Sequence, residues 1–232
     1  MKGVSPKISG FLEYYIRSHR THFSGAPFNG QLRRQEIFLE LIKATPFAAI
    51  VETGTNLGTT TAYVSRESQL PIYTVESVPR YYYCSWFRLR HFSNIHLFLG
   101  DSRAFLERLS HDDLFPKERV LFYLDSHWQE DLPLREEVAV IAKSWSESVI
   151  IVDDFQVPDD KGYAFDDYGD GKRLCIEYLD PMGMPNLDIF MPAAPSDSET
   201  GLRRGCIVLA TKGSTSRTLA SLKSLRSIHP IH

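Results

Sequence analysis

Five short apolar runs, separated by helical patterns, are the feature that most constrains what this chain can fold into. They cover residues 47–52, 71–77, 95–101, 120–125 and 148–154. Each run is continuous rather than alternating, which is typical of strands buried on both faces of a parallel sheet. The sequence therefore predicts an α/β fold of the Rossmann-like, three-layer kind, with helices on both faces of the sheet.

Each run also carries an acidic residue at its carboxyl end, namely Glu52, Glu76, Asp101, Asp125 and Asp153. In open α/β sheets, ligands bind outside the carboxyl ends of the strands, so the five acids would converge on one crevice. Any single acid at such a position can instead cap the helix that follows it. The repetition at all five ends favours a ligand site.

The rest of the chain divides into helices, a polar loop and a late pair of strands. Residues 79–92 and 131–145 carry apolar residues at helical spacing. Residues 155–173 are dense in Gly, Pro, Asp and aromatic residues, which is typical of a functional loop in an α/β enzyme. The runs at 187–192 and 205–210 have no crossover helix between them, and they predict an antiparallel hairpin.

Length and composition exclude several functional classes. The 232 residues, 43% apolar and 24% charged, suit one globular domain, and a net charge of −3 gives no reason to expect a nucleic-acid or membrane partner. Cys84, Cys175 and Cys206 are odd in number and far apart, so we expect no disulfide framework. Because residues 1–20 contain no apolar run long enough for a signal peptide or a membrane span, we expect a cytoplasmic protein.

The first run leads directly into a turn that contains two glycines, ETGTNLGTTT at residues 52–61. Gly54 and Gly58 let the backbone turn sharply and approach a ligand, and the next helix offers its N-terminal amides. The turn is not the GxGxxG fingerprint of dinucleotide-binding proteins, because Thr55 and Asn56 occupy it. The glycine pair alone is weak evidence for any particular ligand.

Two acids downstream strengthen the interpretation of this turn as part of a binding site. Glu76 ends the second run, where a carboxylate can accept hydrogen bonds from both hydroxyls of a ribose, although a solvated strand end is the alternative. Asp101 and Ser102 end the third run, where they could meet an adenine amino group. A ligand built from a ribose and a base fits both positions.

On these motifs the sequence resembles the class I methyltransferases, which use S-adenosylmethionine (SAM). ETGTNLG looks like their first motif, TVES like the acidic second and GDS like the third, over about residues 48–211. The resemblance implies a mainly parallel seven-stranded sheet of order 3-2-1-4-5-7-6 with an antiparallel seventh strand. Residues of the glycine turn would surround the methionine portion, Glu76 would hold the ribose, and Asp101 with Ser102 would bracket the adenine. The cofactor-binding positions implied in this way are Glu52, Thr53, Gly54, Thr55, Asn56, Gly58, Thr59, Glu76, Ser77, Asp101, Ser102 and Asp125.

The fourth and fifth runs end in several acids close together. Asp125 lies in LDSHW, and Asp153 and Asp154 lie in IVDDF. Carboxylates at adjacent strand ends repel one another unless they are neutralised, and a hard divalent cation such as Mg2+ is a simple remedy. The alternatives are an acidic cleft without a metal, or Asp154 acting only as a helix N-cap.

This pattern resembles the metal-dependent O-methyltransferases, both the catechol type and the macrocin type that methylates sugars of natural products. LDSHWQEDLPLREEV, IVDDF and YAFDDYG at 163–169 favour the macrocin type, and FNGQLRRQEIF at 28–38 resembles its N-terminal lid. The resemblance implies that Asp125, Asp153 and Asp154 bind the metal.

The sequence departs from that family at Asp125-Ser126-His127, where Asp-Gly-Asp is usual. Methyl transfer from a sulfonium is an in-line displacement, and a neutral alcohol is a poor nucleophile. A cation lowers the pKa of an alcohol, and a nearby imidazole can take its proton near neutral pH. We therefore predict His127 as the catalytic base beside Asp125, with a structural histidine or a metal ligand as the alternatives. Trp128 is either a wall of the pocket or a core aromatic.

The sequence thus predicts a SAM-dependent and Mg2+-dependent O-methyltransferase that acts on a small hydroxylated metabolite or the sugar of a glycoside. Residues 1–45 would form a helical lid, residues 46–212 the SAM-binding domain, and residues 213–232 a tail or peripheral helix. An oxidoreductase that uses NAD is a second hypothesis, which the missing GxGxxG disfavours. A non-catalytic SAM-binding scaffold is a third, and the formation of a homo-oligomer stays open.

Overall fold

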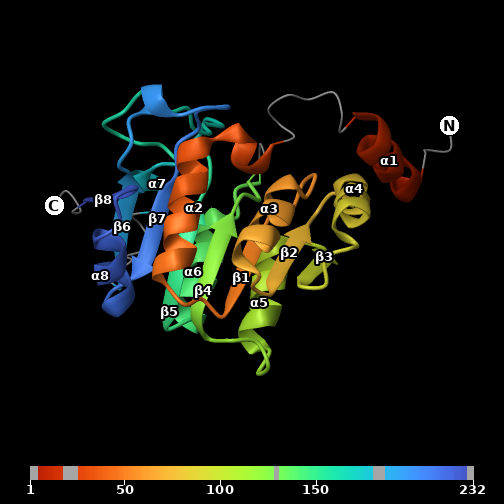
Figure 1. The fold of residues 1–232 in the computed structure, drawn as a ribbon, viewed down its shortest axis with the longest axis horizontal. Coiled ribbons are helices and arrows are strands. Elements are labelled where there is room, and N and C mark those ends of the chain that lie inside the picture. Colours follow the sequence, from red (N-terminus) through yellow and green to blue (C-terminus); the bar gives the residue numbers. More distant parts are fainter. Residues whose placement is uncertain (1–4, 18–25, 128–130, 180–185, 229–232) are drawn as a thin grey trace.

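The protein is an eight-stranded sheet between two layers of helices (Figure 1). The computed structural model describes residues 5–17, 26–127, 131–179 and 186–228. The strands are β1 (Ala49–Thr53), β2 (Ile72–Glu76), β3 (Ile95–Leu99), β4 (Glu118–Leu124), β5 (Glu147–Val152), β6 (Leu187–Pro192), β7 (Ile207–Thr211) and β8 (Leu225–Ile228). The helices are α1 (Pro6–Leu12), η1 (Glu13–Arg17), η2 (Pro27–Gly30), α2 (Leu32–Ala44), α3 (Thr59–Ser68), α4 (Pro79–Leu89), α5 (Ser102–His111), α6 (Leu134–Ser144), α7 (Ile176–Leu179), η4 (Ser196–Ser198) and α8 (Ser214–Ala220).

The order of the strands is β3-β2-β1-β4-β5-β7-β6-β8. Strands β1 to β5 pair in parallel, whereas β7 is antiparallel to both β5 and β6. The predicted order of seven strands and the predicted late hairpin are therefore confirmed. The parallel arrangement brings the carboxyl ends of β1 to β5 to one edge of the sheet.

The two faces of the sheet bury separate cores because side chains alternate along each strand. In β1, Ala49 and Val51 pack on the face covered by α5 and α6. Ile50, between them, packs on the opposite face, which α2, α3 and α8 cover. Burial on both sides thus explains the continuous apolar runs of β1, β2, β4 and β5, whereas β3, at the edge of the sheet, has no fully buried residue.

Segments near both ends of the chain pack against the sheet. Within the expected lid of residues 1–45, α2 packs Ile37, Phe38 and Leu41 into the core against one face of the sheet. Within the expected tail, α8 is followed by β8, which pairs antiparallel with β6 and adds an eighth strand. The short β8, which contains Ser and Arg, has no strong strand pattern in its sequence. It forms a strand because it pairs with β6, and strand formation depends strongly on such neighbours.

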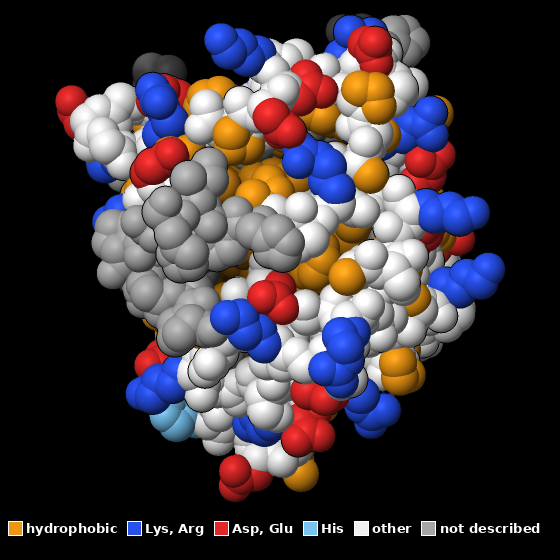
Figure 2. Space-filling model, turned by 90° about the vertical axis from the view of Figure 1, so that its left-hand side faces the viewer, with side chains coloured by type: hydrophobic (Ala, Val, Ile, Leu, Met, Phe, Trp, Pro, Cys, Tyr) orange, Lys and Arg blue, Asp and Glu red, His pale blue; other side chains and the backbone are white. Residues whose placement is uncertain are grey.

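The surface at the β8 edge carries basic and acidic side chains mixed over the part that the structure describes (Figure 2). Among the described residues, no helix combines the length and the hydropathy that crossing a bilayer requires.

Candidate functional site

The turn after β1 lies against the end of β4. Gly54 has a φ of +85°, and a Cβ atom at this position would lie 2.2 Å from the carbonyl oxygen of Asp125. The amide of Asp125 in turn donates to the carbonyl oxygen of Thr53. Only glycine combines that backbone conformation with so close an approach. The turn and the first residue of the acidic cluster are therefore held together by backbone packing.

Glu52 lies beneath this turn with 4% of its surface exposed. Its Oε2 atom accepts hydrogen bonds from the hydroxyls of Thr61 at 2.5 Å and Thr74 at 2.6 Å, and the Thr74 hydroxyl also bonds to Thr55. Burial raises the pKa of Glu52 to about 7 even though the two hydroxyls oppose the rise. The observed bonds of Glu52 tie the turn to α3 and β2.

Glu76 also holds the turn. One of its carboxylate oxygens accepts from the amide of Asn56 at 2.7 Å and the other from the amide of Val78 at 2.8 Å. Asn56 adopts a left-handed conformation with a φ of +49°, which presents its amide to the carboxylate. Burial raises the pKa of Glu76 above its ordinary value. The next residue, Ser77, is exposed.

Asp101 is the N-cap of α5. Its carboxylate accepts from the amides of Arg103 and Ala104, and it forms an ion pair with the Arg103 side chain at 2.7 Å. This exposed acid therefore caps its helix, which is the role that the sequence offered as the alternative to ligand binding. Ser102 is buried beside it, and its hydroxyl lies 3.3 Å from that of Ser126. Thr53 is buried, and Thr59 begins α3 directly after Gly58.

Asp125, His127 and Asp154 come together where β4 and β5 end. Each offers one oxygen or nitrogen atom, and these atoms lie within 4.8 Å of one another. The Nε2 atom of His127 lies 3.9 Å from Asp125 Oδ1 and 4.0 Å from Asp154 Oδ2. Only 3% of the His127 side chain is exposed, and its Nε2 has no hydrogen-bond partner among the residues that the structure describes. A buried nitrogen without a partner, facing two carboxylates, is an arrangement that a cation would complete.

The structure differs from the expectation at Asp153. Its carboxylate accepts hydrogen bonds from the Arg34 guanidinium and from the Tyr123 hydroxyl, and all three side chains are buried. Burial opposes ionisation of Asp153, but Arg34 outweighs it and holds the pKa of this carboxyl below its usual range. Asp153 thus forms an ion pair with α2 and lies outside the cluster of possible metal ligands.

Arg34 itself is fully engaged at this position. Its second terminal nitrogen donates to the carbonyl oxygens of Arg204 at 2.8 Å and Gly205 at 2.9 Å. The residue belongs to the segment 28–38 that the sequence linked to an N-terminal lid, but its partner is 119 positions away. Local sequence offers no signal for that pairing.

Two further residues extend the acidic cluster. Asp166, in the loop at 155–173, lies with its Oδ2 3.8 Å from His127 Nε2. The Arg204 guanidinium binds Asp154 Oδ1 at 2.5 Å and also pairs with Asp166 Oδ1. Asp166 is the first Asp of the YAFDDYG motif, so the motif could have identified it from the sequence. No sequence motif pointed to Arg204.

The cluster has more acidic than basic groups. Three carboxylates, those of Asp125, Asp154 and Asp166, face the guanidinium group of Arg204, so the formal charge is −2 when all are ionised. Burial, with the charges of the neighbouring aspartates, raises the pKa of Asp125 well above its ordinary value and that of Asp154 to about 7. Burial also lowers the pKa of His127, which favours the neutral imidazole.

The segment that carries the cluster is anchored from α6. The Ser126 hydroxyl donates to Glu137 Oε1 at 2.7 Å, and Glu137 is buried. This bond fixes the residue between Asp125 and His127. Trp128 lies outside the described residues.

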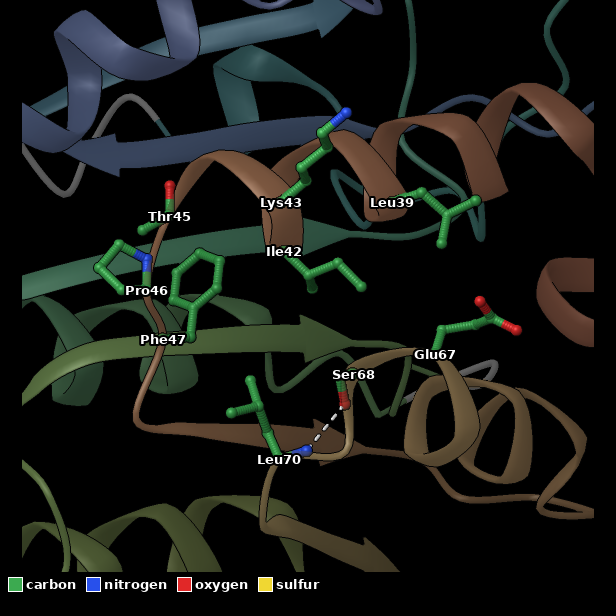
Figure 3. A pocket seen from close by; sticks show the side chains of 9 residues that line it. All are labelled: Leu39, Ile42, Lys43, Thr45, Pro46, Phe47, Glu67, Ser68 and Leu70. Atoms are coloured by element: carbon green, nitrogen blue, oxygen red, sulfur yellow. Dashed lines mark hydrogen bonds between the residues drawn. The ribbon is translucent and has the colours of Figure 1, made fainter.

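A separate cavity of about 450 Å3 lies at the amino ends of β1 and β2, away from the acids (Figure 3). Ile42, Phe47 and Leu70 form its apolar floor, with Lys43 and Glu67 near its rim. Since ligands of open α/β sheets bind at the carboxyl ends, the acidic edge remains the candidate site.

The sequence matches no family model, and no curated protein matches it. Solved structures do match the fold. An O-methyltransferase from Bacillus cereus in complex with S-adenosylhomocysteine (SAH) has a TM-score of 0.58 and 14% identity, over 91% of this chain and 93% of that one. The O-methyltransferase TomG from Streptomyces achromogenes, involved in tomaymycin synthesis and in complex with SAM, has a TM-score of 0.58 and 14% identity, over 91% and 92%. A putative O-methyltransferase from Klebsiella pneumoniae has a TM-score of 0.56 and 16% identity, over 92% of both chains.

Proposed function

We propose that this chain, which has the fold of the class I O-methyltransferases, transfers the methyl group of SAM to a hydroxyl group of a small molecule. The observation that carries the proposal is the contact between two sites. Gly54, in the turn after β1, packs on the backbone of Asp125, which belongs to the acidic cluster. A cofactor at the turn would therefore lie beside a group of residues suited to activating an acceptor.

On the cofactor side, we propose that the turn at 54–58 surrounds the methionine portion, that Glu76 holds the ribose and that Asp101 with Ser102 contacts the adenine. The structures from Bacillus cereus and Streptomyces achromogenes contain SAH and SAM. Glu76 accepts hydrogen bonds from the backbone amides of Asn56 and Val78, and a carboxylate, with about four acceptor positions, can also accept from a ribose hydroxyl. These features support the assignment.

On the acceptor side, we propose that Asp125, His127 and Asp154 hold a divalent cation. The orphaned Nε2 of His127 and the formal charge of −2 in the cluster support this. When bound, the cation supplies a positive charge that favours the deprotonated form of an acceptor hydroxyl. The loop at 155–173, which contributes Asp166 beside His127, would cover the acceptor. A small hydroxylated metabolite, such as the sugar unit of a glycoside, fits this arrangement.

In the reaction the bond between sulfur and the methyl carbon breaks as the bond between that carbon and the acceptor oxygen forms. The electron pair of the broken bond stays on sulfur, which gives SAH, and the hydroxyl proton passes to water. Burial lowers the pKa of His127 and so favours the neutral imidazole, in which one ring nitrogen carries a lone pair that can bind a cation or a proton. Arg34 holds the pKa of the neighbouring Asp153 below its usual range, which disfavours transfer of the acceptor's proton to this carboxylate.

The test is a comparison of SAM, SAH and NAD as ligands by calorimetry, followed by an assay of SAH release over a panel of hydroxylated acceptors with added Mg2+. We expect SAM and SAH to bind and NAD not to bind. Binding of NAD alone would point to an oxidoreductase. Binding of SAM without transfer to any acceptor would indicate a scaffold.

A further inference from the structure

The imidazole of His127 makes the acidic cluster chemically different from a site built of oxygen atoms alone. Its Nε2 is buried, has no hydrogen-bond partner among the described residues, and lies 3.8 to 4.0 Å from one oxygen each of Asp125, Asp154 and Asp166. These separations are too long for hydrogen bonds. Two ligand atoms that are each about 2.1 Å from one ion lie at most about 4.2 Å apart, so the distances suit ligands of a shared ion.

Arg204 orients two of these carboxylates. It binds Oδ1 of Asp154 and Oδ1 of Asp166, which leaves the Oδ2 atom of each directed at His127. Asp166 Oδ2 also accepts a hydrogen bond from Tyr168. A carboxylate oxygen can accept that bond and still bind a cation through its other lone pair.

The backbone fixes Asp166 in this position as well. Its amide donates to the carbonyl oxygen of Asp154 at 2.9 Å, and its carbonyl oxygen accepts from the amide of Leu174 at 3.0 Å. Asp166 is therefore held by Asp154, two residues after β5, through its amide and by Leu174 through its carbonyl oxygen. The long loop at 155–173 returns it to the cluster.

We propose that Asp166 joins Asp125, His127 and Asp154 as a fourth protein ligand, and that His127 makes this site prefer a first-row transition ion such as Mn2+ over Mg2+. Imidazole suits transition ions, whereas Mg2+ takes oxygen ligands and keeps much of its water. The proposal rests on the proposed function only in placing a cation at this edge of the sheet. It also makes His127 a metal ligand instead of the catalytic base, because a nitrogen that binds the ion cannot take the proton from the substrate hydroxyl.

The experiment is calorimetric titration of the metal-stripped chain with MnCl2 and with MgCl2, without SAM or acceptor. We expect Mn2+ to bind at least about ten-fold more tightly than Mg2+. His127→Asp, which restores an oxygen ligand, should reduce that ratio at least about ten-fold, mainly by weakening Mn2+. Asp166→Asn should weaken Mn2+ about ten-fold or more. Asp167→Asn is the matched control, because Asp167 is the adjacent, exposed acid and pairs with Arg173.

Pulsed electron paramagnetic resonance of the Mn2+ complex provides a readout that a merely structural histidine would not change. Coupling of the ion to a 14N nucleus should be present in the parent chain and absent in His127→Asp, with both proteins shown to be folded by circular dichroism. Equal or tighter binding of Mg2+, no Mn2+ binding, no nitrogen coupling, or unchanged binding in Asp166→Asn would overturn the proposal. Methyl transfer that resists EDTA would contradict the cation site but would leave the proposed methyltransferase function intact. Mn2+ binding without SAM binding would support the cation site but would contradict the proposed methyltransferase function.

Discussion

The carboxyl ends of β1 to β3 and those of β4 and β5 both carry acids, but the two regions neutralise them in different ways. In the first region, Glu52 and Glu76 accept bonds from hydroxyls and amides, and Asp101 caps α5. In the second, Asp153 and Asp154 depend on the guanidinium groups of Arg34 and Arg204, which come from distant segments. The first region is therefore held mainly by hydrogen bonds between residues at most 22 positions apart, and the second by ion pairs between residues 50 and 119 positions apart.

The largest expected effect tests the long-range pairing. Arg34→Ala would leave Asp153 buried beside Tyr123 without its counter-charge. Loss of one partner of a buried ion pair typically costs about 3–5 kcal/mol of unfolding free energy. Urea unfolding followed by circular dichroism at pH 7 measures this.

Arg33→Ala is the control for that measurement. Arg33 lies on the same helix and forms only an exposed pair with Glu36. Its removal should leave the unfolding free energy nearly unchanged. Equal effects of the two substitutions would refute the contrast between the regions.

A smaller effect, which depends on pH, is expected in the first region. Burial raises the pKa of Glu52 from about 4.5 to about 7, so the folded state keeps a proton that the unfolded state loses in this window. Folding stability should therefore fall as the pH rises from about 4.5 to 7, and stay level above that range. Glu52→Gln removes the titration, and its amide oxygen can still accept from Thr61 and Thr74.

We expect Glu52→Gln to gain about 2–3 kcal/mol over the parent at pH 8 and little at pH 4, measured by urea unfolding of the cofactor-free protein at both values. If the variant and the parent kept the same pH dependence, Glu52 would be ionised without penalty in the folded protein.

The smallest effect concerns Asp101. Asp101→Ala should destabilise α5 and lower the unfolding free energy by about 1 kcal/mol, whereas Asp101→Asn should retain most of the cap. Calorimetry with SAM then separates two roles. If Asp101 also contacts the adenine, SAM affinity falls in the alanine variant. Unchanged affinity would restrict Asp101 to the cap.

The glycine turn shows how much of the site was predictable. Residues 52–58 and the acids that follow each strand are close in sequence to the elements that position them, so their placement at one edge follows from parallel strand order. The pairing of Asp153 with Arg34 could not be predicted, because the two residues are 119 positions apart in the sequence. Arg204 is 50 positions from Asp154 and 38 from Asp166, so local sequence gave no signal for these pairs either, and Asp166 was a motif residue without an assigned role.

The sequence by itself determined the parallel sheet and the edge at which the acids gather, because continuous apolar runs with helices between them are typical of a parallel sheet covered on both faces. The order of the strands was implied by the resemblance to class I methyltransferases. Only the tertiary structure decided which acids are neutralised and which face His127. Residues from α2, from the loop at 155–173 and from the segment before β7 meet there. Charge pairing depends on distance in space, which hydrophobic periodicity along the chain does not encode.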